Sequence, residues 1–152
     1  MVFKVNISEK TGKTFHLDID NEELIGKILK DKIAGTEISP ELNAYEFQIT
    51  GLSDKAGFTS MENVEGIGLK RILLTYGKGM KKRPKKEGKR KRSKNRPKGL
   101  KLRKTVRGNT ISPEIVQINL KILKEGSKKL SEIFPDQNKK ADVEKPLEAV
   151  SQ

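Results

Sequence analysis

The feature that most constrains the fold of this chain is a concentration of positive charge between residues 78 and 107. Seventeen of these thirty residues are Lys or Arg, and Glu87 is the single acid, so the segment carries a formal charge of +16. The whole chain of 152 residues carries +13, which leaves 13 minus 16, or −3, for the rest. Mutual repulsion opposes the compaction of such a segment. The fold must therefore be built from the residues on either side of it.

The basic segment also has few side chains that a core could use. Its apolar residues are Met80, Leu100, Leu102 and Val106, and Pro and Gly residues interrupt any helix. A run of charge is more often a solvated protein surface, but here there is almost no acid to balance the cations. We therefore expect an extended arm or loop that becomes ordered on a polyanion.

Apolar and polar residues alternate in short runs on both sides of the basic segment. A period of two places every second side chain on the same face of a strand. The pattern predicts a mainly β protein, a small antiparallel barrel-like domain with one or two short helices and a long basic loop. The alternating sets are Phe3, Val5 and Ile7; Phe15, Leu17 and Ile19; Tyr45, Phe47 and Ile49; Ile72, Leu74 and Tyr76; and Val116, Ile118, Leu120 and Ile122.

The last alternating set lies beyond the basic segment and must bury its apolar face against the N-terminal strands. This predicts one β domain over residues 1–134, with residues 78–107 as an insertion. A polar tail, expected to be flexible, follows over residues 135–152.

Two short helices are expected. The first begins near Asp20, because Asp20 and Glu23 have capping-box spacing before an apolar stripe that continues to Leu29. The second runs from about residue 128 to residue 134 and ends at Pro135.

No group of residues supports catalysis. The chain has no cysteine and a single histidine, His16, which the alternation places on the outward face of a strand. Residues 11–14 resemble the end of a P-loop, but Ile7 stands where that motif requires glycine, and Thr14 leads into a strand. We expect no enzymatic activity, no cofactor, no metal site and no small-molecule substrate.

A membrane partner is not expected either. No apolar run approaches the roughly 18 residues of a membrane-spanning helix, and the first residues lack the apolar stretch of a secretory signal. An anionic membrane surface could attract the basic segment, but no amphipathic helix or lipidation motif accompanies it. The sequence therefore favours a soluble cytoplasmic protein with a polyanionic partner.

The kind of polyanion is indicated by what the basic segment lacks. It contains no Phe, Tyr or Trp, whereas modules that read single strands stack bases on aromatic side chains. The segment is thus expected to follow the phosphates and the shape of folded RNA. DNA stays open on electrostatic grounds, although no helix-turn-helix or zinc module is visible.

Two stretches resemble the eukaryote-type ribosomal protein "S six" family, in its short archaeal form. One runs from Gly51 to Phe58 (GLSDKAGF) and is followed by Met61; the other runs from Leu102 to Ile111 (LRKTVRGNTI) and leads into a strand. Thr59 departs from the family pattern, which usually has proline there. The resemblance covers roughly residues 1–126.

The resemblance implies a structural constituent of the small ribosomal subunit that binds rRNA in the cytoplasm beside neighbouring ribosomal proteins and is a monomer when free. The alternative is a free-standing RNA chaperone or general nucleic-acid-binding protein. By position, the resemblance makes Asp54, Lys55, Gly57 and Phe58 a structural turn, with Phe58 in the core. It also makes Lys101, Arg103, Lys104 and Arg107 RNA-facing. The basic run from residue 78 to residue 99 is longer than the resemblance accounts for, and there the expectation rests on charge alone. That run adds the RNA-binding residues Lys78, Lys81, Lys82, Arg83, Lys85, Lys86, Lys89, Arg90, Lys91, Arg92, Lys94, Arg96 and Lys98.

Overall fold

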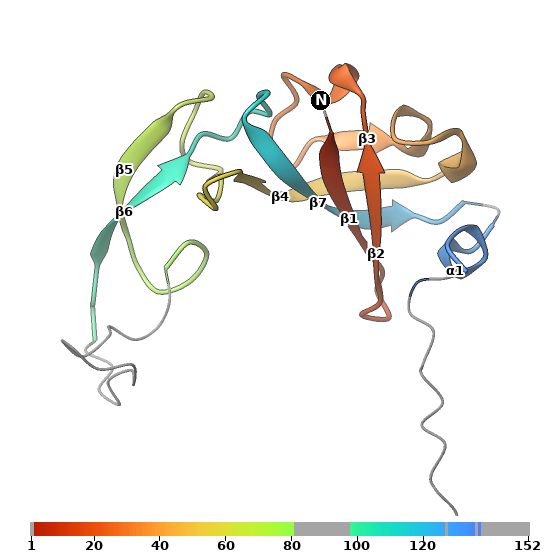
Figure 1. Cartoon of the computed structure of the whole chain (residues 1–152). Helices are drawn as coiled ribbons and strands as arrows, with labels where there is room; N and C mark the ends of the chain where they lie inside the picture. Colours follow the sequence, from red (N-terminus) through yellow and green to blue (C-terminus); the bar gives the residue numbers. More distant parts are fainter. Residues whose placement is uncertain (1, 81–97, 127, 136, 138–152) are drawn as a thin grey trace, which may run out of the picture.

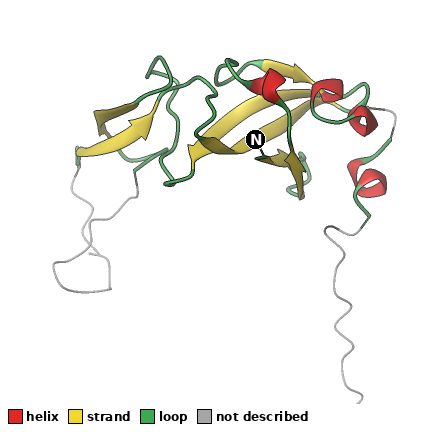
Figure 2. Cartoon of the chain, turned by 45° about the horizontal axis from the view of Figure 1, so that its top comes forward, coloured by secondary structure: helices red, strands yellow, loops and turns green. Residues whose placement is uncertain are grey.

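The computed structural model describes residues 2–80, 98–126, 128–135 and 137, and these are mainly β, which confirms the predicted class (Figure 1). The helical elements are short and lie beside the larger sheet, away from β5 and β6 (Figure 2). They are the 3-10 turns η1 (Glu22–Leu24), η2 (Gly35–Glu37) and η3 (Pro40–Leu42) and the helix α1 (Leu130–Ile133). The strands are β1 (Phe3–Ser8), β2 (Thr14–Ile19), β3 (Lys32–Ala34), β4 (Glu46–Asp54), β5 (Leu69–Leu74), β6 (Leu102–Arg107) and β7 (Ile115–Lys124).

Five strands form one open sheet in the order β2-β1-β7-β4-β3. Neighbours are antiparallel except β1 and β7, which are parallel. The sheet is thus mixed, and its outer strands do not pair with each other among the described residues, unlike the antiparallel barrel-like closure that was expected. At the outer edge of β2, the Gln137 amide forms 2.7 Å hydrogen bonds to both the N–H and the C=O of His16.

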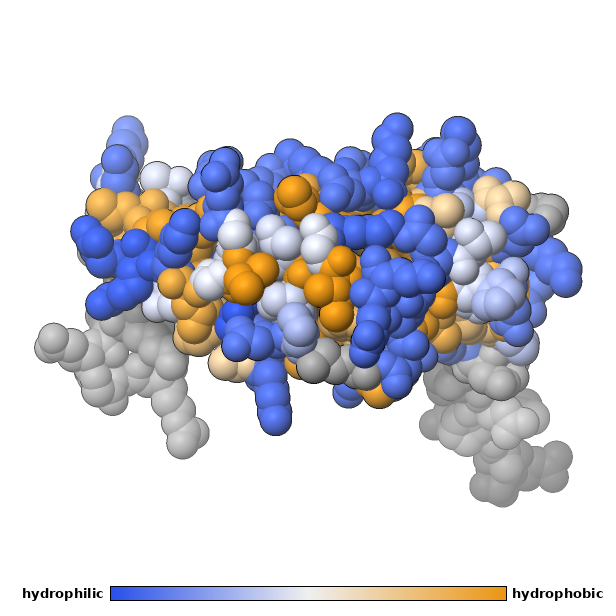
Figure 3. Space-filling model, turned by 90° about the horizontal axis from the view of Figure 1, so that it is seen from above, coloured by the Kyte–Doolittle hydropathy of each residue, from blue (hydrophilic) through white to orange (hydrophobic). Residues whose placement is uncertain are grey.

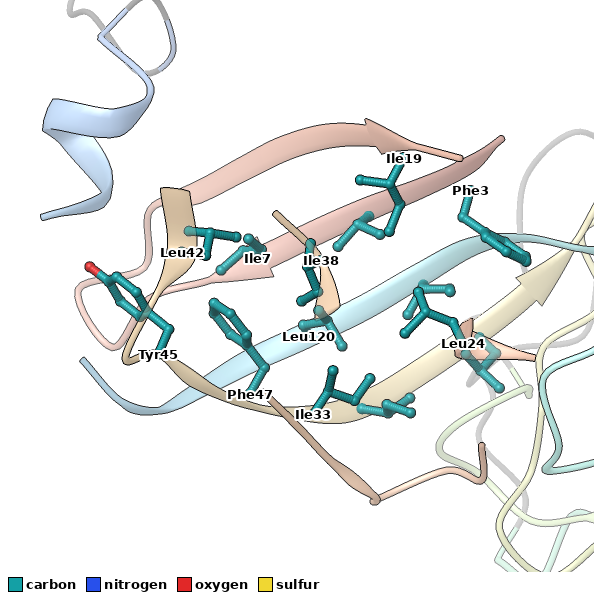
Figure 4. Close-up of a cluster of buried hydrophobic side chains, with 14 of the residues drawn as sticks. Phe3, Ile7, Ile19, Leu24, Ile33, Ile38, Leu42, Tyr45, Phe47 and Leu120 are labelled. Atoms are coloured by element: carbon teal, nitrogen blue, oxygen red, sulfur yellow. The ribbon is translucent and has the colours of Figure 1, made fainter. Parts of the chain in front are cut away.

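The main core covers one face of this sheet (Figure 4). The alternating apolar side chains of β1, β2, β4 and β7 face the segment that holds η1, η2 and η3, which contributes Leu24, Ile38 and Leu42. Each fully buried Leu, Ile or Phe stabilises the fold by roughly 1.5–3 kcal/mol relative to exposure. The predicted alternation is confirmed for most positions; Val116 is half-buried, and Tyr76 lies beyond β5 and is exposed.

The opposite face of the sheet is polar. Asn119 lies near its centre, and its Oδ1 accepts hydrogen bonds from the Asn6 and Gln117 amides at 2.9 and 3.0 Å. His16 Nδ1 lies 2.6 Å from Asn6 Oδ1 on this outward face, as the alternation predicts. These side chains form a chain of hydrogen bonds along the polar face.

The predicted helix over residues 20–29 is wrong. Only η1 forms, and Asn21, not Asp20, caps it by accepting a hydrogen bond from the Glu23 N–H. Gly26 then takes a left-handed φ of +91°, and the following backbone pairs with distant strands: Ile111 N–H donates to Lys27 O at 2.8 Å. Tertiary backbone pairing has overridden the local helical pattern.

The second predicted helix is confirmed as the four-residue α1, which ends before Pro135. Leu130 is buried in the main core, and the ring centroids of Phe134 and Phe15 lie 6.0 Å apart. The Tyr45 hydroxyl donates to the Lys128 carbonyl, and burial raises the pKa of Tyr45 above its usual value. Most of the predicted tail, over residues 135–152, lies outside the described residues.

Candidate nucleic-acid interface

Strands β5 and β6 form a separate two-stranded sheet that precedes and follows the most basic part of the chain. Their antiparallel register pairs Lys70 with Val106, Ile72 with Lys104 and Leu74 with Leu102. The even-numbered side chains therefore share one face of this hairpin. That face packs on a second hydrophobic cluster, made of buried Val64, Leu74, Met80 and Val106 with the partly buried Met61, Ile72, Leu100 and Leu102 around them.

All four apolar residues of the basic segment take part in this second cluster. Met80 is 3% exposed and Val106 is 1% exposed, while Leu100 and Leu102 pack against them. Met80 also forms a β-bridge with Gly77. Residues 81–97 are outside the described part of the chain, but the residues on both sides of them are anchored to the same folded hairpin.

The expectation that all of residues 78–107 form an arm or loop is thus wrong for the part that contains β6. The physical reason is that Leu102 and Val106 are four residues apart on β6, so their side chains lie on the same face of the strand. There they form a small core with Val64 and Leu74. The segment cannot fold by itself, but its C-terminal third folds against residues that precede it.

Five of the predicted RNA-binding residues are described and exposed, namely Lys78, Lys98, Lys101, Arg103 and Lys104. They surround the anchored ends of residues 81–97. Lys78 Nζ donates to the Thr50 carbonyl at 3.3 Å, and so it links the start of the segment to β4. The predicted residues outside the described part are Lys81, Lys82, Arg83, Lys85, Lys86, Lys89, Arg90, Lys91, Arg92, Lys94 and Arg96.

Two exposed cations of the hairpin were missed by the sequence analysis. Lys70 and Arg71 lie on β5, opposite Val106 and Thr105 of β6. Both precede the acid-poor run from which the predicted set was drawn. They could have been found by recognising that β5, which precedes the basic segment, pairs with β6, which lies inside it.

The sequence stretch from Asp54 to Phe58 forms a tight turn at the end of β4. Phe58 N–H donates to Asp54 Oδ1 at 2.9 Å, and Gly57 N–H donates to Asp54 O at 3.0 Å. Gly57 has a φ of +86°, which glycine adopts without steric cost. Lys55 is exposed at the tip. Phe58 is half-buried and belongs to neither hydrophobic cluster, unlike the core position that was expected.

Arg107 is a correction to the predicted RNA-facing set. Its side chain is 7% exposed, and its Nε donates to the buried Asp54 Oδ2 at 3.0 Å. Its Nη1 donates to the Ile67 carbonyl at 2.9 Å and to the Glu114 carboxylate. Because one guanidinium joins the end of β4, the start of β5 and the approach to β7, Arg107 connects the two sheets instead of facing solvent.

The residue after Arg107 leaves no room for a side chain, which gives a first test of this junction. A Cβ at Gly108 would lie 1.7 Å from the Gly66 carbonyl oxygen. We expect Gly108→Ala to destabilise the protein by about 1–3 kcal/mol or more, because the added methyl group would force the backbone around Gly66 to move. The matched control is Gly68→Ala, where a Cβ meets nothing within 4 Å. Urea unfolding of both variants should separate them; equal midpoints would contradict the close packing.

One acid lies near the base of the basic segment. The hydrogen bond from Lys30, at 2.6 Å in the ion pair, together with the charges of Lys30 and Lys78, holds the pKa of Glu62 below its usual range. Glu62 therefore stays ionised at neutral pH and offsets positive charge on that side of the hairpin.

The described residues contain no group of three or more His, Cys, Asp or Glu side chains placed to hold a metal ion. None of their helices is long and apolar enough to cross a membrane. The fold and the site together define a class: a small protein with an open β sheet that presents a basic hairpin.

Comparison with known proteins identifies the family within this class. The family model described as "Ribosomal protein S6e" matches residues 3–98 and 93–135. The chain is 39% identical over 128 residues to "Small ribosomal subunit protein eS6" of Methanococcus maripaludis strain C5, covering 84% of this chain and 91% of the relative. It is 40% identical to the protein of the same name from Methanothermobacter thermautotrophicus, covering 88% and 96%, and 39% identical to that of Archaeoglobus fulgidus, with the same coverage. The chain belongs to the ribosomal protein S6e family, which confirms the resemblance.

Proposed function

We propose that this chain is a structural constituent of the small ribosomal subunit, is not an enzyme, and binds folded rRNA through phosphate contacts. Membership of the S6e family supports the assignment, because its archaeal relatives bear the name of a small-subunit protein. The protein then resides in the cytoplasm, in the ribosome, beside other ribosomal proteins, and is a monomer when free. Residues 1–134 act as one rRNA-binding domain.

The observation that carries the RNA-binding part is the anchoring of both ends of residues 81–97. This stretch has eleven Lys or Arg and one acid. Met80, just before it, and Leu100, shortly after it, both pack in the second cluster. Anchoring restricts where the charges can reach, which reduces the conformational entropy lost when they meet phosphates. The exposed Lys78, Lys98, Lys101 and Lys104 extend the positive surface onto the folded hairpin.

Lys and Arg contribute differently to such a surface. Arginine can hold a phosphate with two parallel hydrogen bonds, whereas lysine acts as a mobile point charge. With no aromatic residue in the segment to stack on bases, binding follows the phosphate positions of a folded RNA with little reading of base identity.

A salt titration tests the phosphate mechanism. If about ten cations neutralise phosphates, log affinity for small-subunit rRNA should fall with log salt concentration at a slope of about −7 to −9. Between 50 and 200 mM salt, a fourfold rise, the affinity should then fall about 10⁴–10⁵-fold. An affinity that does not respond to salt would contradict the proposal.

Co-sedimentation distinguishes a ribosomal constituent from a free-standing RNA chaperone. A constituent is expected at one copy per small subunit and should stay there through a moderate salt wash. A chaperone would bind purified rRNA in the same titration, yet would be substoichiometric in subunits and would be lost in the wash.

A further inference from the structure

The face of the β5–β6 hairpin opposite the second cluster carries a different set of side chains. Odd-numbered residues point to this outer face, because the even-numbered ones pack on the cluster. On β5 these are Leu69, Arg71 and Leu73. On β6, Arg103 lies opposite Leu73 and Thr105 opposite Arg71, while Arg107, opposite Leu69, is buried in its ion pair with Asp54 and marks the end of the exposed face. Ile67 lies in the bend just before the strand and is also exposed. We refer to Ile67, Leu69, Arg71, Leu73 and Arg103 as the outer face.

Three large aliphatic side chains of the outer face are open to solvent. Ile67 is 57% exposed, Leu69 is 47% exposed and Leu73 is 58% exposed. Apolar surface is visible at the end of the molecule that holds the hairpin, on the left of Figure 3. Scattered exposed apolar residues are normal, but Leu69 and Leu73 lie on the same face of one strand with Arg71 between them, and Ile67 lies two residues before that strand.

The cations of the outer face are both arginines. Arg71 and Arg103 are diagonal neighbours across the hairpin, and neither forms an ion pair within the described part of the chain. The inner face has lysines instead, Lys70 and Lys104, at its exposed rim. Protein–protein interfaces are enriched in arginine and depleted in lysine at their centres.

This composition separates a protein partner from RNA. Phosphates would satisfy the two arginines, but they gain nothing from three exposed aliphatic side chains, which would be dehydrated against charged oxygens. An apolar protein segment buries those side chains favourably, and its carboxylates can pair with the arginines in two parallel hydrogen bonds.

We propose that the outer face docks an apolar segment with acidic side chains from a neighbouring protein of the small subunit. This rests on the proposed function and assigns Arg71 and Arg103 to a protein contact, while the other exposed cations of the hairpin and the basic segment keep their role toward RNA. The hairpin face is about 20 Å long and about 10 Å wide, from six residues and two strands. An area of about 200 Å² is far below the roughly 800 Å² per partner of a stable interface, so docking requires a neighbour already held in the particle and not a second copy in solution.

Photo-cross-linking in assembled particles tests this. The full chain with Leu73→p-benzoylphenylalanine would replace the native copy in cells, and small subunits would be purified and irradiated. We expect a covalent adduct that protease removes and ribonuclease does not, joined to a peptide with Asp or Glu within a few residues of the attachment point. The matched control is Lys104→p-benzoylphenylalanine on the opposite face of the hairpin, which is expected to give a ribonuclease-sensitive adduct.

Other results overturn the inference. A Leu73 adduct with rRNA, an adduct with a second copy of this chain, or no adduct from a chain present in the subunits would each exclude the docked acidic segment. Absence of the chain from purified subunits would instead refute the proposed function. As a second measurement, Leu69→Ser with Leu73→Ser should leave affinity for naked rRNA within about twofold while lowering retention in salt-washed subunits; unchanged retention would count against docking.

Discussion

Replacing residues 81–97 by a neutral Gly-Ser linker of equal length is expected to remove most of the affinity for rRNA without unfolding the protein. The replacement takes away eleven cations and one acid, so the net charge falls from +13 to 13 minus 10, or +3. If three or four phosphate contacts remain on the hairpin, the slope of log affinity against log salt should flatten to about −2 to −4. Filter binding to small-subunit rRNA at several salt concentrations measures both the affinity and the slope.

The fold should survive this change because the described part of the chain has its own cores. Met80 and Leu100 keep their places in the second cluster, and the main core is built from residues 3–52 and 111–134 of the described chain. The urea midpoint should change little. Loss of cooperative unfolding would show that residues 81–97 have a packing role.

A shuffled stretch is the matched control for the neutral linker. It keeps the same composition over residues 81–97, and therefore the same net charge, in a different order. If the segment follows phosphates, naked rRNA affinity should stay within about threefold and the salt slope should not change. A loss as large as that of the neutral linker would mean that particular residues, and not total charge, determine binding.

The elements that could be predicted from the sequence are those whose alternation is long and regular. The faces of β1, β4 and most of β7 follow from it, because a strand half-buried in a sheet must repeat with period two. β3 was missed, since its three residues are too few to show a period. The parallel pairing of β1 with β7 could not be inferred either, because alternation specifies faces and not neighbours.

Where local and tertiary signals conflicted, the sequence misled. The apolar stripe from Leu24 to Leu29 fits a helix, and both residues are buried. Their backbone is nevertheless irregular, because its hydrogen bonds go to residues 109–111 and to β4. The basic segment misled in the opposite direction. Its net charge indicated an unfolded arm, although Leu102 and Val106 pack against residues some thirty positions earlier in the chain. Contacts that distant in the sequence could not be inferred from the segment itself.

Arg107 was placed with the RNA-binding residues because charge alone does not distinguish a buried cation from an exposed one. Arg107→Met is expected to destabilise the protein by about 3–5 kcal/mol, since Asp54 would remain buried without its counter-charge. Adding Asp54→Asn should recover at least about 1 kcal/mol of that loss, because the charge disappears while the amide oxygen can still accept from Phe58 N–H. Urea unfolding of the two single variants and the double variant gives the coupling energy.

The slope of log rRNA affinity against log salt concentration distinguishes a structural role of Arg107 from the RNA contact that was expected. In Arg107→Met the salt slope for naked rRNA should match that of the unsubstituted protein under conditions where both are folded, because the side chain presents no charge to a phosphate. The matched control on the same strand is Lys104→Met, which should leave stability within about 0.5 kcal/mol and reduce the slope by about 0.9. If Arg107→Met is as stable as the unsubstituted protein and lowers the slope by a similar amount, the guanidinium contacts RNA and the ion pair with Asp54 does not connect the sheets.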